Sequence, residues 1–293
     1  YFMSFLIFAL VYPFVLLLSK LPFRVLYIIS DLVFCILYYI VGYRRDVVLF
    51  NLKTAFPEMD KATLKETEKR FYHHFCDLFI EVIKTLSISE QTLRDRYLFT
   101  NIEVLQKYVD KGQPVLVTMG HYASYEWVFA LATLLKDHPG YAIYKKIKNP
   151  YFDKMIRDIR SKWNSTLVPN KQAREKIKEV LATQKGFAYF GFIMDQSPSN
   201  PNNKHFSSFL NVQTPFFTGV EKLSKQYDLP VLFLGTTRVK RGYYSSTFSV
   251  LAETPKQHPD FAITDAYAKI LTELIIKEPT YYFWTHKRFK FLK

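Results

Sequence analysis

Short apolar runs with the length of β-strands alternate with helical stretches through the last two thirds of the chain. Alternation of this kind favours an α/β fold, in which helices flank a mostly parallel central sheet. The strand-like runs are 115–117, 141–144, 166–168, 187–193, 231–237 and 244–250, and the helical stretches are 122–136, 151–162, 171–183, 219–227 and 261–277.

Two apolar runs precede this part of the chain. Residues 2–19 carry no charge, and residues 25–43 carry only Asp31. A helix that spans a bilayer needs about 20 apolar residues. The first run is barely long enough and contains Pro13, and the second places a costly carboxylate in its middle. We expect a retained N-terminal membrane anchor at residues 1–45, and two buried core helices of a soluble protein are the alternative.

The remaining residues, 46–293, are expected to form one catalytic domain, with a helical entry at 46–110 and an α/β part at 111–293. Residues 51–89 carry a helical pattern of apolar positions. The segment 197–203 is rich in Pro and Asn, and this composition suits a mobile lip over a site.

The charge and the aromatic content indicate what the chain binds. A net charge of +14 together with 17% aromatic residues combines positive and apolar surface, which suits an anionic membrane face and acidic or phosphorylated partners. Zinc-finger spacing and RNP-type motifs are absent from the sequence, so nucleic acid is not expected as a partner. Cys35 and Cys76 provide neither a disulfide framework nor a metal-ligand pair, which fits a reducing, cytosol-facing compartment.

One motif carries chemistry. In TMGHYASYEW, residues 118–127, a histidine follows the first predicted strand of the α/β part, and a glutamate follows five residues later. Gly120 allows a sharp turn, and the expected helix would offer amides near Gly120 to an oxyanion. Glu126 could reach back to the ring and orient His121 as a general base. Ser124 lacks the G-x-S-x-G elbow of a nucleophile, so direct deprotonation of an acceptor hydroxyl or amine is the simplest reaction.

With this H-x4-E motif, the chain resembles the bacterial lipid A biosynthesis acyltransferases, a family within the glycerolipid acyltransferase group. The resemblance extends over nearly the whole chain. It rests on four further stretches in the same order: YKKIKNPYFDKMIRDIR (144–160), GFIMDQSP (191–198), TPFFTG (214–219) and YYFWTHKRFK (281–290).

The resemblance implies transfer of an acyl chain from acyl carrier protein or coenzyme A to a hydroxyl of a lipid A precursor, an anionic lipid acceptor, at the cytoplasmic face of the bacterial inner membrane. It places His121 and Glu126 on the catalytic pair, Arg160 or else Arg157 on a site arginine, and Asp195 with Gln196 on the motif after the central strand. The basic segment that includes Lys146 and Asn149 would bind phosphates or the acidic carrier protein. No metal or redox cofactor is expected. Other acceptors (lysophospholipid, aminolipid or glycolipid), a thioesterase or lipase, and a non-catalytic basic membrane-binding protein are the alternatives.

Overall fold

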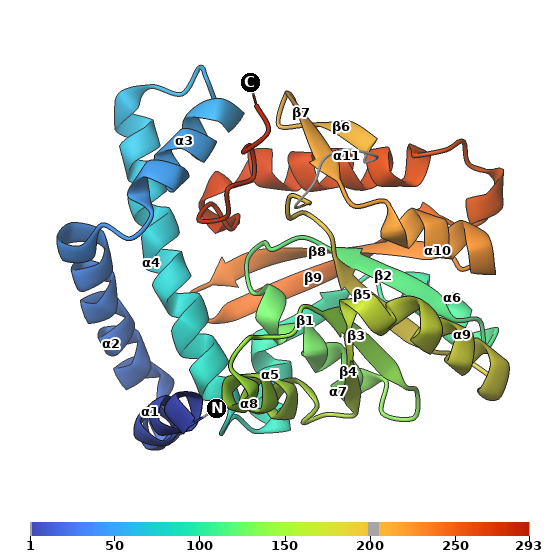
Figure 1. The fold of residues 1–293 in the computed structure, drawn as a ribbon, viewed down its shortest axis with the longest axis horizontal. Helices are drawn as coiled ribbons and strands as arrows, with labels where there is room; N and C mark the ends of the chain where they lie inside the picture. Colours follow the sequence, from blue (N-terminus) through green and yellow to red (C-terminus); the bar gives the residue numbers. More distant parts are fainter. Residues whose placement is uncertain (1, 199–204, 293) are drawn as a thin grey trace.

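The computed structural model describes residues 2–198 and 205–292. Its centre is a seven-stranded sheet in the order β1-β9-β8-β2-β5-β3-β4 (Figure 1). Neighbouring strands run parallel except β8 and β9, which are antiparallel. The predicted α/β class with a mostly parallel sheet is therefore confirmed. The strands are β1 (Tyr97–Thr100), β2 (Val115–Met119), β3 (Gly140–Tyr144), β4 (Ser165–Pro169), β5 (Tyr189–Ile193), β8 (Val231–Lys240) and β9 (Tyr243–Ala252).

Strand β2 lies at the middle of the sheet, between β5 and β8. All five of its residues are buried, because helices cover both faces of a parallel sheet and leave no polar side to the strand. In the β2–β5 pairing Met119 lies opposite Ile193. The chain therefore leaves both strands at the same edge of the sheet, with His121 two residues past one strand and Asp195 two residues past the other.

Helices surround the sheet on its faces and at one end. Besides α1 and α2, described below, they are α3 (Arg45–Ala55), α4 (Lys61–Thr85), α5 (Glu90–Arg96), α6 (Glu103–Asp110), α7 (Leu131–Leu134), α8 (Pro150–Arg160), α9 (Ala173–Thr183), α10 (Gly219–Tyr227) and α11 (Ala262–Lys277), with short 3₁₀ segments η2 (Tyr125–Ala130), η3 (Asn170–Gln172), η4 (Pro255–Gln257) and η5 (Pro279–Tyr281). A two-stranded hairpin of β6 (His205–Phe209) and β7 (Val212–Phe216), which the sequence patterns did not predict, packs against α11.

The helix predicted over residues 122–136 is helical only over 125–134, where a 3₁₀ segment precedes a single α-helical turn. Tyr122 forms an isolated bridge with Tyr282, the amide of Ala123 donates to the Tyr281 carbonyl, and Ala123 has φ +49°. These contacts and the left-handed backbone of Ala123 bend the chain away from a helical path, and it continues as the 3₁₀ segment η2 and the single turn α7. A long helix dipole beside His121 is therefore not present.

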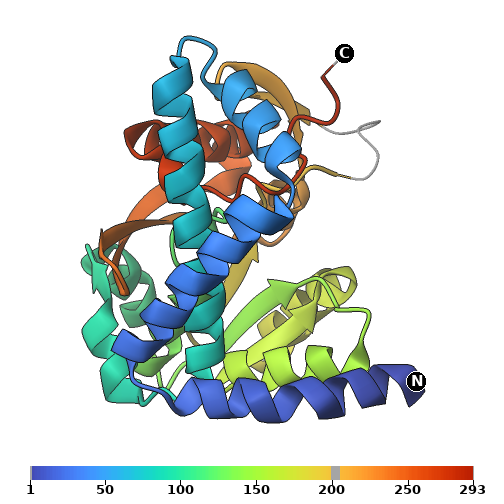
Figure 2. The same ribbon diagram turned by 90° about the vertical axis from the view of Figure 1, so that its left-hand side faces the viewer.

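The two apolar N-terminal runs form helices. These are α1 (Phe2–Lys20) and α2 (Phe23–Cys35), and α2 continues as the π-helix η1 (Ile36–Val41). Figure 2 shows α1 lying across one end of the molecule and α2 running obliquely along α4. By length and composition, residues 23–41 form the one helix in the described part of the chain that could cross a membrane, and only 22% of it is buried.

Candidate active site

His121 and Asp195 face each other at the carboxyl edge of the sheet. The His121 Nδ1 lies 2.6 Å from Asp195 Oδ1, and the His121 backbone amide donates to Asp195 Oδ2 at 3.1 Å. The Asp195 side chain is 2% exposed and the His121 side chain 17% exposed, so the carboxylate is buried behind a ring that solvent can still reach. His121 donates hydrogen bonds from its backbone amide and from its ring to the same carboxylate, so both the backbone and the ring are held in place.

This geometry determines which ring nitrogen is free. A carboxylate accepts hydrogen bonds, so the neutral ring carries its proton on Nδ1 and leaves a lone pair on Nε2. Burial alone would raise the pKa of the Asp195 carboxyl, but the charge of His121 and its hydrogen bonds outweigh burial and hold the pKa below its usual range. The Gln196 amide nitrogen lies 3.4 Å from Nε2. His121 is therefore arranged as a base with Nε2 directed toward a polar neighbour.

Glu126 does not contact the His121 ring. It forms a bidentate pair with Arg160, with Arg160 Nη2 at 2.7 Å from both carboxylate oxygens and Nε at 3.1 Å from Oε2. The expectation that Glu126 orients the ring is thus corrected: Asp195 occupies that position. The bend at Ala123 and the 3₁₀ turn carry Glu126 toward α8, whereas the sheet register carries Asp195 to His121.

Arg160 lies in the last turn of α8 and is the cation that the structure brings to Glu126. Burial alone would lower the pKa of the Arg160 guanidinium, but the Glu126 carboxylate outweighs burial and raises that pKa, so Arg160 stays positively charged. Arg157, the second candidate, pairs instead with Asp153 on its own helix at 3.2 Å and is 47% exposed. The structure therefore joins Arg160, and not Arg157, to the predicted site.

Three further residues were predicted for the site: Asn149, Lys146 and Gly120. Asn149 caps α8 and accepts hydrogen bonds from the amides of Tyr151 and Phe152, while Lys146 is exposed in the loop before it. Gly120 has no left-handed backbone; a Cβ there would come within 2.6 Å of the buried Leu271.

The amide following Gly120 already donates to Asp195. It is therefore not available to an oxyanion. The chain turns tightly here, since the Tyr122 amide donates to the Gly120 carbonyl at 2.8 Å, and close packing against Leu271 of α11 is what requires a glycine.

The C-terminal segment supplies neighbours that were not predicted as site residues. The ring of Phe283 lies 5.9 Å from that of His121, and the fully buried Arg288 donates to Ser197 Oγ at 3.1 Å and adds its charge to the field that lowers the Asp195 pKa. His286 Nε2 accepts from the Ser197 amide at 3.0 Å, and burial lowers its pKa to about 4. His286 is therefore a neutral acceptor that holds this loop, and not a second base. The expected lip at 197–203 lies mostly outside the described residues.

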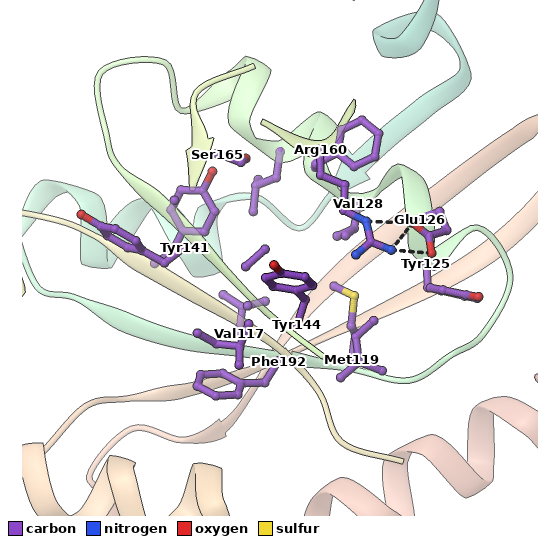
Figure 3. Close-up of a pocket in the computed structure, with 18 residues that line it drawn as sticks. Val117, Met119, Tyr125, Glu126, Val128, Tyr141, Tyr144, Arg160, Ser165 and Phe192 are labelled. Carbon is purple, nitrogen blue, oxygen red and sulfur yellow. Dashed lines mark hydrogen bonds and ion pairs between the residues drawn. The ribbon is translucent and has the colours of Figure 1, made fainter. Parts of the chain in front are cut away.

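An apolar cavity of about 110 Å³ begins beside the Glu126–Arg160 pair (Figure 3). Its walls come from strands β2, β3 and β5, and Figure 3 shows Val117, Met119 and Phe192 on one side, with Tyr144 across from them and the ion pair at one end. His121 does not line this cavity. It is separated from it by Tyr125, whose ring packs edge-on against the histidine at 4.9 Å.

The helices α1 and α2, with η1, expose many apolar side chains, and α1 packs against α8. Phe8 of α1 packs on Tyr151 and Phe152 of α8, the helix that carries Arg160. We call the exposed residues of these helices the apolar face: Met3, Phe5, Leu6, Ile7, Leu10, Val11, Phe14 and Leu17 of α1, and Val25, Ile28, Leu32, Val33, Ile36, Tyr39, Ile40 and Val41 of α2 and η1. An exposed apolar surface of this extent is typical of a membrane-contacting protein.

A buried carboxylate that fixes a histidine at the carboxyl edge of a parallel sheet forms a site suited to general-base catalysis, and an apolar cavity lies on the other side of Tyr125. Residues 2–291 match the family described as bacterial lipid A biosynthesis acyltransferase. The chain belongs to this family and is an acyltransferase of lipid A biosynthesis, which implies transfer of an acyl group to a lipid A precursor. No curated protein sequence matches the chain.

Proposed function

We propose that the protein transfers a fatty acyl group from acyl carrier protein, or from coenzyme A, to a hydroxyl of a lipid A precursor, with His121 as the general base. The observation that carries this proposal is the 2.6 Å contact between His121 Nδ1 and Asp195, which leaves Nε2 free to accept a proton. His121 Nε2 removes the proton of the acceptor hydroxyl as its oxygen attacks the thioester carbon. The tetrahedral intermediate then expels the thiolate, which takes the proton from the imidazolium and leaves as the thiol.

The Glu126–Arg160 pair supports the same reaction from the cavity side. Arg160 is 26% exposed on its side chain and lies at the end of the apolar cavity, where a thioester carbonyl would stand if the acyl chain filled the cavity. Its fixed positive charge would stabilise the oxyanion, and Glu126 would hold the guanidinium in place. Because the His121 amide is already bonded to Asp195, this cation is a better candidate for the oxyanion than the amides near Gly120.

The apolar face and an exposed group of lysines would determine how the protein contacts the membrane and the acyl carrier protein. The apolar face of α1 and α2 would place the enzyme at the cytoplasmic face of the inner membrane. Lys145, Lys146 and Lys148 are exposed in the loop that follows Tyr144, a cavity residue, and would receive the acidic carrier protein beside the cavity entrance.

The test is mass spectrometry of lipids after purified protein is incubated with acyl-loaded carrier protein and a mixed pool of lipid A precursors and lysolipids. Wild type and the control variant His258→Ala, which replaces a histidine far from the site in sequence and unused by it, should make an acylated lipid A species, and His121→Ala should make none. Acylation of a lysolipid would retain the mechanism and reject the acceptor. Release of free fatty acid alone would reject the transfer and indicate a thioesterase.

A further inference from the structure

A second cavity, of about 290 Å³, lies between α4, the end of β8 with the turn that follows it, and η5. Four cationic side chains line it: Arg70 from α4, Arg238 and Lys240 from the end of β8, and Arg241 from the turn that follows. No carboxylate lines it among the described residues. We call it the basic cavity. A concave site with this many cations on its walls is suited to an anion.

Carboxylates behind the walls hold two of the arginines in place. The fully buried Asp77 lies 3.2 Å from Arg238 Nη2 and 2.6 Å from Arg241 Nη2, and Asp31 of α2 lies 2.5 Å from the same Arg241 nitrogen. These ion pairs fix the guanidinium groups before any ligand arrives, so less side-chain entropy is lost on binding.

The same contacts argue against a metal ion at this place. Asp31, His73 and Asp77 lie close enough together to be ligands of one ion. Arg241 already occupies both carboxylates. The cation of this cluster is therefore the guanidinium, and the cavity in front of it is left for a negative ligand.

Two donors in the cavity wall are not used within the described part of the chain. The Lys240 side chain is exposed, and its ammonium lies 4.3 Å from the centroid of the Tyr243 ring. Among the described residues no carboxylate lies within ion-pair distance of it. The Thr280 hydroxyl is buried without a hydrogen-bond partner in residues 2–198 and 205–292. Arg70 is engaged on one nitrogen, by Glu278 at 2.9 Å. A lysine, a threonine hydroxyl and an arginine with spare N–H groups form a donor set that matches phosphate oxygens.

From this we infer that the basic cavity binds the phosphate group of a lipid head group. The inference rests on the proposed acyl transfer to a lipid acceptor. Arg241 in the cavity wall pairs with Asp31 of α2, one of the helices of the apolar face. Tyr281, also in the cavity wall, lies two residues before Phe283. Tyr281 lines the cavity while its carbonyl accepts from Ala123 of the catalytic loop. A phosphate held here would sit at the membrane-facing side, with its lipid directed toward His121.

The phosphate has two possible sources, the acceptor itself or a neighbouring membrane phospholipid. Both are tested by steady-state kinetics in mixed micelles with Lys240→Ala and Arg70→Gln, which spare the arginines that bind Asp77. The acceptor is a lipid A precursor that carries a phosphate monoester, compared with the same precursor after phosphatase treatment. The micelles contain either phosphatidylglycerol or only neutral detergent. Lys178→Ala, an exposed lysine on α9, is the control for the loss of one charge.

If the phosphate belongs to the acceptor, each variant should raise KM for the phosphorylated acceptor by about tenfold with little change in kcat. Removal of the phosphate should then raise the wild-type KM by the same factor, and wild type and the variants should no longer differ. If it belongs to a phospholipid, the difference should persist with the dephosphorylated acceptor and disappear in neutral micelles. Equal KM values for the two variants, Lys178→Ala and wild type under every condition would overturn the inference. Absence of acyl transfer by wild type would instead reject the proposed function.

Discussion

Replacement of Asp195 by Asn should damage catalysis more than replacement of Glu126 by Gln. In Asp195→Asn the amide still fits the space, but it can donate to His121 Nδ1 while its oxygen accepts from the His121 backbone amide. The ring would then carry its proton on Nε2 and lose the lone pair that acts as base.

The magnitude follows from two contributions. Loss of a charge-assisted hydrogen bond costs about 1.5–3 kcal/mol, or about 10- to 100-fold in rate. The wrong tautomer adds to this, and the same change in hydrolytic triads lowers kcat by about 10⁴-fold. We therefore expect kcat of Asp195→Asn to fall by about 10²- to 10⁴-fold. Glu126→Gln removes only the ionic part of a partly exposed pair with Arg160 and should cost about tenfold.

The assay is transfer of a radiolabelled acyl group from carrier protein to a lipid A precursor, with kcat and KM determined for both variants and the thermal midpoint measured as a check on folding. Both variants should keep KM for the donor within a few-fold of wild type. A larger loss in Glu126→Gln than in Asp195→Asn, with both proteins folded, would refute the assignment of Asp195 as the orienting carboxylate.

Three further predictions concern packing, the cavity and acid stability. Gly120→Ala should lower stability by about 1–3 kcal/mol because its Cβ would meet Leu271 at 2.6 Å, and a second change, Leu271→Ala, should make the Gly120→Ala step less costly in a thermal or denaturant melt. Gly191→Ala should shift donor preference toward shorter acyl chains, measured as the ratio of kcat/KM for two chain lengths, because Gly191 lines the apolar cavity and a Cβ there would come no closer than 3.9 Å to the nearest backbone atom. The pKa of His286 is about 4 in the folded protein and about 6.5 in the unfolded chain. Between pH 4 and pH 6.5 the unfolded chain therefore binds more protons, and the free energy of unfolding falls as the pH drops through this range. His286→Gln should reduce that loss by about 1–2 kcal/mol after solvent screening, and parallel pH curves of the two proteins would contradict it.

The sheet could be predicted from the sequence because its strands carry a local signal. Each of the six predicted runs coincides with an observed strand, since buried parallel strands are continuous apolar runs between turn residues. The hairpin β6–β7 was not predicted, because VQTPF contains a proline and the two adjacent serines of HFSSF leave no apolar run and no alternation. Strand β1 follows directly on α5 in a stretch that was expected to be helical.

The sequence pointed to His121, Glu126, Arg160 and Asp195 as candidate site residues, but not to the contacts between them or to the neighbours Phe283 and Arg288. The spacing of His121 and Glu126 is a property of one short segment, and it suggested that they face each other. The actual partner, Asp195, lies 74 residues further along the chain and reaches the ring only because β2 and β5 are neighbours in register. That adjacency is a property of the sheet topology, which no local pattern contains. The same is true of the basic cavity, whose four cations come from α4, from the end of β8 and from the turn that follows it.

The central claim is that Asp195 holds His121 with Nδ1 protonated and Nε2 free, and nitrogen NMR tests it most directly. Protein labelled with ¹⁵N-histidine would be measured in micelles at a pH where the ring is neutral, with His121→Gln used to assign the signal. The structure predicts an Nδ1–H tautomer in wild type and in Glu126→Gln, and its loss in Asp195→Asn. An Nε2–H tautomer in wild type, or a tautomer that changes in Glu126→Gln and not in Asp195→Asn, would contradict the account.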